Sequence, residues 1–214
     1  MTIQAKTLVL FDFDGTLTKG DTLSRFLLFS LPINQLVIGT FVLVFRFLGI
    51  FLSGKWSNEK GKEALFSTFY KGQSFEVLQQ LGTSFCQQQL PQFLRPELLA
   101  QMREYHQTGA TVVLVSASLD IWLRPFCREE GIQLICTELE FANHHFSGKF
   151  ATPNCSGPEK ARRIKTALDL SSFQKIIAFG NSKNDTEMLA LADEAWLVRR
   201  VNHTFATQIN KTTP

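Results

Sequence analysis

The stretch TLVLFDFDGTLT, at residues 7–18, decides the fold, because its apolar run ends in two aspartates and a glycine. Residues 7–13 predict a buried strand with Asp12 at its carboxyl end. Four further strands are predicted at 111–115, 132–136, 175–179 and 195–198, and helices at 96–107, 118–130, 158–168 and 185–192. This alternation predicts an α/β fold with a parallel sheet and helices on both faces. In such sheets ligands bind beyond the carboxyl ends of the strands.

The alternation is interrupted in two places. Residues 137–150 predict a β-hairpin with its turn near 143–145. Residues 19–89 have helical periodicity and hold ten of the 20 phenylalanines. We therefore expect a helical cap at 19–89, inserted into a core made of 1–18 and 90–214. The tail after Asn202 predicts a short helix and a frayed end.

Composition limits the class of protein. The chain has 214 residues, of which 44% are apolar, so it can form one compact domain with an inserted lobe. The net charge of +3 is small and scattered, which argues against nucleic acid as a partner. The four cysteines lack the spacing of a metal site, and the first residues lack the features of a signal peptide. We therefore expect reduced thiols in a cytoplasmic protein.

Asp12 and Asp14 are the strongest chemical signal. Two carboxylates at the end of a buried strand project into one polar pocket, where they repel each other and are poorly solvated. A Mg²⁺ ion would relieve both costs, since it prefers oxygen ligands. Gly15 lets the backbone approach a ligand closely, and its N–H is placed for an oxyanion. The alternative is a simple turn with one capping aspartate.

Later strand ends offer further polar groups at the same edge of the sheet. Ser116 provides a hydroxyl for an oxyanion, whereas Ser118 is interpreted as the N-cap of the next helix. The fourth strand ends in GNSKND at 180–185, which supplies oxygen ligands. Lys160 begins the helix before that strand. It would neutralise a phosphate if it faced the pocket, and would otherwise lie on the surface.

Four motifs in this order along the chain resemble those of the haloacid dehalogenase superfamily. They are DFDGT at 12–16, Ser116, Lys160 and GNSKND at 180–185. The inserted lobe resembles the first-type helical cap of its phosphoserine phosphatase-like subfamily. The resemblance covers essentially the whole chain and implies a three-layer, Rossmann-like core. It also implies a phosphatase, because the dehalogenase and phosphonatase branches lack the second carboxylate, here Asp14.

The resemblance implies a role for each motif residue. Asp12 would be the nucleophile that forms an aspartyl-phosphate, and Asp14 the general acid and then the base. Mg²⁺ would be held by the Asp12 carboxylate, the Asp14 carbonyl and Asn181, and Asp185 would orient metal-bound water. The phosphate-binding groups would be Gly15, Thr16, Ser116, Ala117, Lys160 and Asn184. The family's usual aspartate is Asn181 here, so we expect weaker metal affinity rather than inactivity.

The cap is expected to select the substrate. It has no arginine between Phe47 and Phe93 to bind a carboxylate, which disfavours phosphoserine although Asp21 and the lysines Lys60, Lys62 and Lys71 are available. Residues 22–52 contain no acidic residue, and 36–52 are apolar on every face. This segment is interpreted as buried cap helices, as a membrane-docking surface over residues 26–52, or as a membrane span.

The sequence therefore predicts a Mg²⁺-dependent phosphomonoester hydrolase. The substrate is a small-molecule or lipid phosphomonoester, with a phosphorylated lipid or another apolar ester favoured by the cap. The protein would be cytoplasmic, or peripheral at the inner face of the membrane. The alternatives are a phosphoserine phosphatase, a phosphotransferase on a small metabolite, and a membrane-associated binding protein with an inactive site.

Overall fold

The computed structural model describes residues 6–52, 54, 57–198 and 207–209. Its main sheet has six strands in the order β3-β2-β1-β6-β7-β8. The strands are β1 (Thr7–Phe11), β2 (Thr111–Leu119), β3 (Gln133–Thr137), β6 (Lys175–Gly180), β7 (Glu194–Leu197) and β8 (Thr207–Ile209). Neighbouring strands are parallel except for β7 and β8. The predicted α/β class is confirmed.

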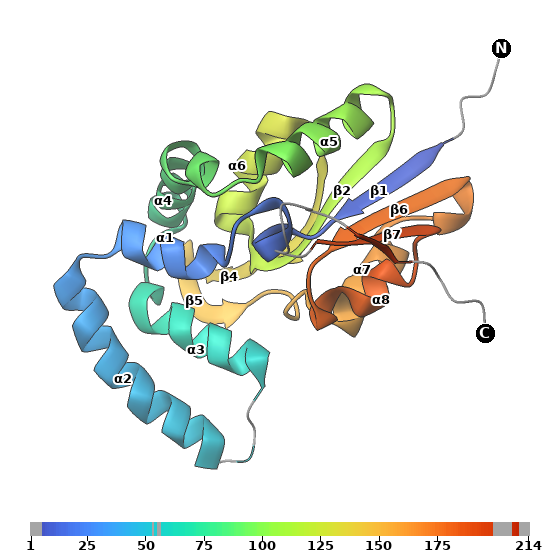
Figure 1. Ribbon diagram of the computed structural model, residues 1–214. Coiled ribbons are helices and arrows are strands. Elements are labelled where there is room, and N and C mark those ends of the chain that lie inside the picture. The colour runs from blue at the N-terminus through green and yellow to red at the C-terminus, as the bar shows by residue number, and fades with distance from the viewer. Residues whose placement is uncertain (1–5, 53, 55–56, 199–206, 210–214) are drawn as a thin grey trace.

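Helices cover both faces of this sheet (Figure 1). One face carries α5 (Pro96–Gln107) and α6 (Asp120–Glu130), and the other α7 (Pro158–Ala167) and α8 (Thr186–Leu189). The central strand β1 explains these layers, because successive side chains of a strand point to opposite faces. Val9 and Phe11 belong to the apolar cluster of α5 and α6, and Leu8 and Leu10 to that of α7 and α8.

Four helices follow β1, form the helical lobe and lie on the left of Figure 1. They are α1 (Thr22–Ser30), α2 (Ile33–Leu52), α3 (Asn58–Tyr70) and α4 (Phe75–Gln88). The Lys19 N–H donates to the Phe93 carbonyl over 2.7 Å, and the Arg95 N–H to the Leu17 carbonyl over 2.7 Å. The segment thus leaves and re-enters the core at one place. Its exact bounds as a cap, 19–89, stay a prediction.

Phenylalanines join this lobe to the core. Phe26 of α1 stacks on Trp122 of α6 with ring centroids 4.8 Å apart, and Phe85 of α4 contacts both rings. Phe66 of α3 lies in the same cluster. The local excess of phenylalanine therefore builds an apolar core that α1, α3 and α4 share with the sheet, and aromatic side chains suit this because each buries a large area.

The predicted hairpin is present as β4 (Leu139–Ala142) and β5 (His145–Phe150). Its turn residues, Asn143 and His144, have φ values of 48° and 62°, which a tight two-residue hairpin turn requires. Phe146 of β5 donates its N–H to the Gln73 carbonyl over 2.8 Å. The hairpin therefore packs against the helical lobe rather than against the main sheet.

Several sequence predictions were wrong in detail. The tail was expected to be helical, but Thr207–Ile209 forms β8, which pairs antiparallel with β7 at the edge of the sheet; residues 199–206 and 210–214 lie outside the described residues. The helix expected at 185–192 is a 3₁₀ turn, Lys183–Asp185, followed by the short α8. The helix expected from 118 begins at Asp120, because β2 continues to Leu119.

Candidate active site

Asp12 follows β1 directly, at the carboxyl edge of the sheet. Its backbone N–H donates to the Phe179 carbonyl over 2.9 Å, which extends the ladder with β6 by one residue. The side chain is 5% exposed, and its Oδ2 accepts a hydrogen bond from Thr16 Oγ1 over 2.7 Å. Thr16 was predicted to bind phosphate; here its hydroxyl donates to the Asp12 carboxylate and orients it.

Gly15 allows the loop to pass close to the end of β6. Its φ of 80° is a conformation that favours glycine, and a Cβ there would lie 2.0 Å from Asn181 Nδ2. Glycine is therefore needed both for the turn and for the approach of Asn181. The Gly15 N–H, which we expected to face an oxyanion, donates to Thr18 Oγ1 over 3.1 Å.

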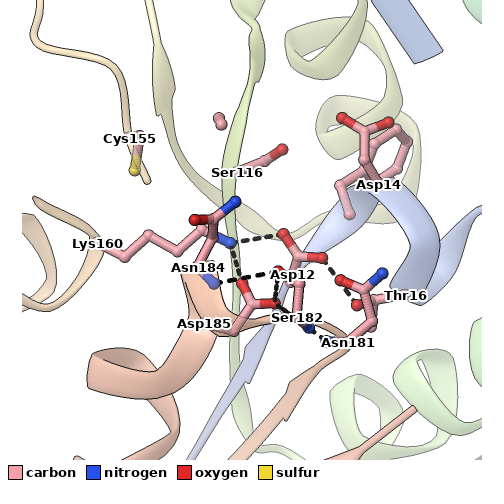
Figure 2. A network of polar contacts seen from close by, with 12 residues as sticks. Asp12, Asp14, Thr16, Ser116, Cys155, Lys160, Asn181, Ser182, Asn184 and Asp185 are labelled. Carbon is pink, nitrogen blue, oxygen red and sulfur yellow. Dashed lines mark hydrogen bonds and ion pairs between the residues drawn. The ribbon is translucent and has the colours of Figure 1, made fainter. Parts of the chain in front are cut away.

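Lys160 connects two carboxylates at the centre of the site (Figure 2). Its Nζ lies 2.5 Å from Asp12 Oδ1 and 2.6 Å from Asp185 Oδ1. The lysine is 2% exposed, although it stands near the start of α7. The interpretation of Lys160 as a solvated surface residue is therefore wrong, and its ammonium lies beside the predicted nucleophile.

Burial and charge set the protonation of this group. Burial raises the pKa of Asp12 to about 6; Lys160 opposes this shift and Asp185 adds to it. Burial also lowers the pKa of Lys160, but the two carboxylates outweigh that effect and the pKa is raised above its ordinary value. Lys160 is thus a permanent cation at neutral pH.

Asp185 is held by several donors. Its Oδ2 accepts hydrogen bonds from the N–H groups of Asn181 and Ser182 and from Ser182 Oγ, each over 3.0 Å. These bonds fix the loop that follows β6 and orient Asp185 towards Lys160. Asn184 is exposed and lies in the turn Lys183–Asp185 that follows β6.

The Asp14 side chain points away from Asp12, towards the helical lobe (Figure 2). Its Oδ1 accepts a hydrogen bond from the Thr22 N–H over 2.8 Å, at the start of α1, and its Oδ2 accepts one from Ser118 Oγ. Burial raises the pKa of Asp14, while the bonds from Ser118 and Thr22 oppose that shift. A buried carboxyl with a raised pKa is suited to proton transfer near neutral pH.

The bond to Asp14 corrects our interpretation of Ser118 as a helix N-cap. The N-cap of α6 is Leu119, whose side chain has no oxygen to accept a capping bond, while the Ser118 hydroxyl bonds Asp14 instead. The partners are separated by 104 residues. No local pattern could have identified this pair, because an N-cap is recognised from residues within one turn of helix.

Ser116 is buried in β2, and its Oγ accepts a hydrogen bond from the Ser118 N–H over 3.0 Å. Between them, the carbonyl of Ala117 accepts a hydrogen bond from Lys62 Nζ, which comes from α3. Burial lowers the pKa of Lys62, and the carboxylates of Asp14 and Asp21 oppose that shift. We considered Lys62 only as a poor substitute for an arginine, and its contact with β2 was not predicted.

The oxygen donors near Asp12 fit Mg²⁺ better than zinc. The Asn181 side chain lies against Gly15, in the loop that begins at Asp12, so an amide and a carboxylate come from adjoining loops at one edge of the sheet. Among the described residues no group of three or more His, Cys, Asp or Glu could hold a metal ion. A set of carboxylate, amide and backbone carbonyl oxygens is typical of hard cations and lacks the nitrogen and sulfur that zinc favours.

Comparisons with known proteins identify the family of this chain. Residues 9–190 match the model of the haloacid dehalogenase-like hydrolases. Protein CicA of Caulobacter vibrioides is 31% identical over 191 residues, which cover 87% of this chain and 83% of that protein. A Bordetella pertussis protein of unknown function has a similar structure, with a TM-score of 0.73 at 21% identity, over 90% of this chain and 89% of that one.

A phosphoserine phosphatase solved as a phospho-aspartyl intermediate analogue also shares the fold, with a TM-score of 0.60 at 18% identity. The alignment covers 90% of this chain and 86% of that chain. The chain belongs to the haloacid dehalogenase-like hydrolases.

Proposed function

We propose that this chain is a Mg²⁺-dependent phosphomonoesterase that is transiently phosphorylated on Asp12. The observation that carries the proposal is the buried Asp12–Lys160 pair, with Nζ 2.5 Å from Oδ1 at the carboxyl end of the sheet. A carboxylate attacking a phosphate dianion is opposed by charge repulsion, so it needs a fixed cation beside it. The hydrolase family and the fold shared with phosphoserine phosphatases support a phosphatase.

In the first step, an oxygen of the Asp12 carboxylate attacks phosphorus, and the bond from phosphorus to the leaving oxygen breaks. Protonated Asp14 donates its proton to that oxygen, so the product leaves as an alcohol. The raised pKa of Asp14 supports this role, as does its position on the side of α1, where the leaving group would project towards the lobe. Lys160 and the Ser116 hydroxyl bind the phosphoryl oxygens.

In the second step, water attacks the phosphorus of the aspartyl-phosphate. Asp14, now ionised, accepts a proton from that water, and the bond between phosphorus and Asp12 breaks. Orthophosphate is released and both carboxyl groups return to their starting states. This use of one residue as acid and then base follows from the reversal of proton demand between the two steps.

The proposed Mg²⁺ would be held by the Asp12 carboxylate, the Asp14 carbonyl and the Asn181 amide. When bound, it supplies positive charge that offsets the repulsion between Asp12 and the phosphate. Asn181 contributes no charge, so the affinity for Mg²⁺ is expected to be lower than with an aspartate at this position.

The substrate class is inferred from α2. Within the described residues, one helix is long and apolar enough to cross a membrane, Ile33–Leu52, and of its residues only Gly39 and Leu43 are buried. The interpretation of this segment as buried cap helices is therefore wrong. Phe41 and Phe45 are 67% and 73% exposed, and further exposed apolar residues are Ile33, Val37, Ile38, Val42, Val44, Leu48, Phe51 and Leu52. Such a surface marks contact with a protein or a membrane.

Docking on the membrane surface is favoured over spanning, because one side of α2 is attached to α3. A Cβ on Gly39 would lie 2.0 Å from Phe69 Cε1. Arg46 Nη1 donates to Thr68 Oγ1 over 2.7 Å and to the Ala64 carbonyl over 3.2 Å. Since α3 in turn contacts the catalytic core, insertion of α2 across the bilayer would also place α3 and part of the core inside the membrane. An apolar phosphomonoester at an anionic membrane surface is the proposed substrate.

Phosphate release from p-nitrophenyl phosphate, with and without Mg²⁺, tests the reaction. We expect Mg²⁺-dependent turnover by the wild-type chain and none by the Asp12→Asn variant. Phosphoserine serves as a polar comparator and should be a poor substrate. If the wild-type protein releases phosphate from none of a panel of phosphomonoesters, the proposed function is refuted.

Phosphatidate in phosphatidylcholine vesicles, with and without phosphatidylglycerol, tests the substrate class. Burying an exposed phenylalanine contributes about 1.5–3 kcal/mol. A variant with both Phe41→Ser and Phe45→Ser should therefore bind vesicles at least ~100-fold more weakly and hydrolyse their phosphatidate more slowly. Its activity on p-nitrophenyl phosphate should not change. Val77→Ser, an exposed apolar position on α4, is the matched control. Equal vesicle binding by all three proteins would refute docking through α2.

A further inference from the structure

Lys62 links the helical lobe to the strand that carries the predicted phosphate-binding serine. It lies on α3, and its Nζ donates a hydrogen bond to the Ala117 carbonyl, 55 residues further along the chain. Lys60 and Lys71, the other two lysines that the lobe was expected to offer a substrate, are exposed. Within the described part of the chain, no carboxylate forms an ion pair with Lys62. Its charge is thus directed at a peptide group.

That peptide group is connected to Ser116. The Ala117 carbonyl and the Ser118 N–H belong to one peptide bond, and this N–H donates to Ser116 Oγ over 3.0 Å. A donor on the carbonyl polarises the peptide and strengthens the N–H as a donor. The chain of bonds therefore runs from Lys62, through one peptide unit, to the serine hydroxyl.

The consequence concerns the direction of the Ser116 hydroxyl. A serine hydroxyl has one hydrogen and two acceptor lone pairs. Because the Ser118 N–H occupies a lone pair of Ser116, the hydroxyl hydrogen is directed elsewhere and can donate to a phosphoryl oxygen. The same Ser118 residue bonds Asp14 through its Oγ. Movement of the Ala117–Ser118 peptide would therefore disturb both the phosphate-binding group and the Asp14 carboxyl.

We propose that Lys62 is a positioning residue: it holds the Ala117–Ser118 peptide so that Ser116 donates to the phosphate, and thereby makes phosphate affinity depend on the lobe lying against the core. The inference rests on the proposed function, because it assumes that Ser116 binds a phosphoryl oxygen. It does not require Lys62 to touch the leaving group, which separates it from a residue that only selects substrates.

Orthophosphate is the decisive probe, because it has no leaving group. We expect Lys62→Met to weaken binding of orthophosphate about 10-fold, measured by calorimetry with Mg²⁺ present, and to raise KM for p-nitrophenyl phosphate to a similar extent. Lys60→Met, on the same helix, should stay within about twofold of wild type, and Lys62→Arg, which keeps a donor, should recover part of the affinity. Unchanged orthophosphate affinity in Lys62→Met would overturn the inference.

A double-mutant cycle with Ser116→Ala shows whether Lys62 acts through Ser116. Once Ser116 is removed, Lys62→Met should have little further effect on orthophosphate affinity, whereas two independent losses that add would overturn the inference. If Lys62→Met does not fold, Lys62→Gln takes its place in the same cycle. Because calorimetry does not depend on turnover, a wild-type protein without activity would refute the proposed function and still leave this test decisive.

Discussion

Replacing Lys160 with methionine tests the central ion group most directly. The ammonium is 2% exposed and contacts Asp12 at 2.5 Å and Asp185 at 2.6 Å, so its removal leaves two buried carboxylates without their shared cation. Breaking a buried ion pair in this way costs about 3–5 kcal/mol. With a urea slope of about 2 kcal/mol per molar, the midpoint of unfolding should fall by about 2 M. Lys165→Met, at an exposed position of the same helix, should change stability by no more than ~0.5 kcal/mol.

The pH dependence of this loss identifies its cause. The pKa of Asp12 is already raised to about 6 with Lys160 present, and the variant should raise it further. A carboxyl whose pKa is higher in the folded than in the unfolded state binds more protons when folded. The stability of Lys160→Met should therefore improve as the pH falls from 8 through 6 towards the unfolded value of 3.8. Urea titrations with a chelator present measure this; a loss equal to that of Lys165→Met, or one independent of pH, would refute the reasoning.

Four further substitutions test the site. Asp12→Asn should lower kcat on p-nitrophenyl phosphate by about 10⁴-fold or more and abolish the covalent phosphoprotein, and full activity would rule out Asp12 as nucleophile. Asp14→Asn should lower kcat by about 10²–10⁴-fold, so a loss confined to KM would contradict its role in proton transfer. Asn181→Asp should lower the Mg²⁺ concentration for half-maximal activity, and no change would remove Asn181 from the proposed ligands. Gly15→Ala should cost about 1–3 kcal/mol in thermal unfolding, because of its φ of 80° and the contact with Asn181.

Much of the catalytic edge could be predicted from local sequence. Asp12 and Ser116 each directly follow an apolar run of a strand, and Asp185 lies in the turn after another such strand. Parallel strands present their carboxyl ends at one edge. Their convergence on one edge therefore followed from the order of strands and helices. The hydrogen bonds within the first loop did not follow from that order: the Thr16 hydroxyl donates to Asp12, and the Gly15 N–H donates to Thr18. Short polar side chains have several partners within reach, and only the folded loop selects one.

The amino-acid order by itself determined the alternating architecture and the polar residues at the strand ends, because both depend on periodicity and on spacing along the chain. Tertiary structure alone decided three features: the exposure of α2, the bond from Ser118 to Asp14, and the reach of Lys62 to Ala117. An apolar helix looks the same in sequence whether a neighbour covers it or not. Hydrogen bonds between residues 55 or 104 positions apart exist only once packing has brought the two segments together.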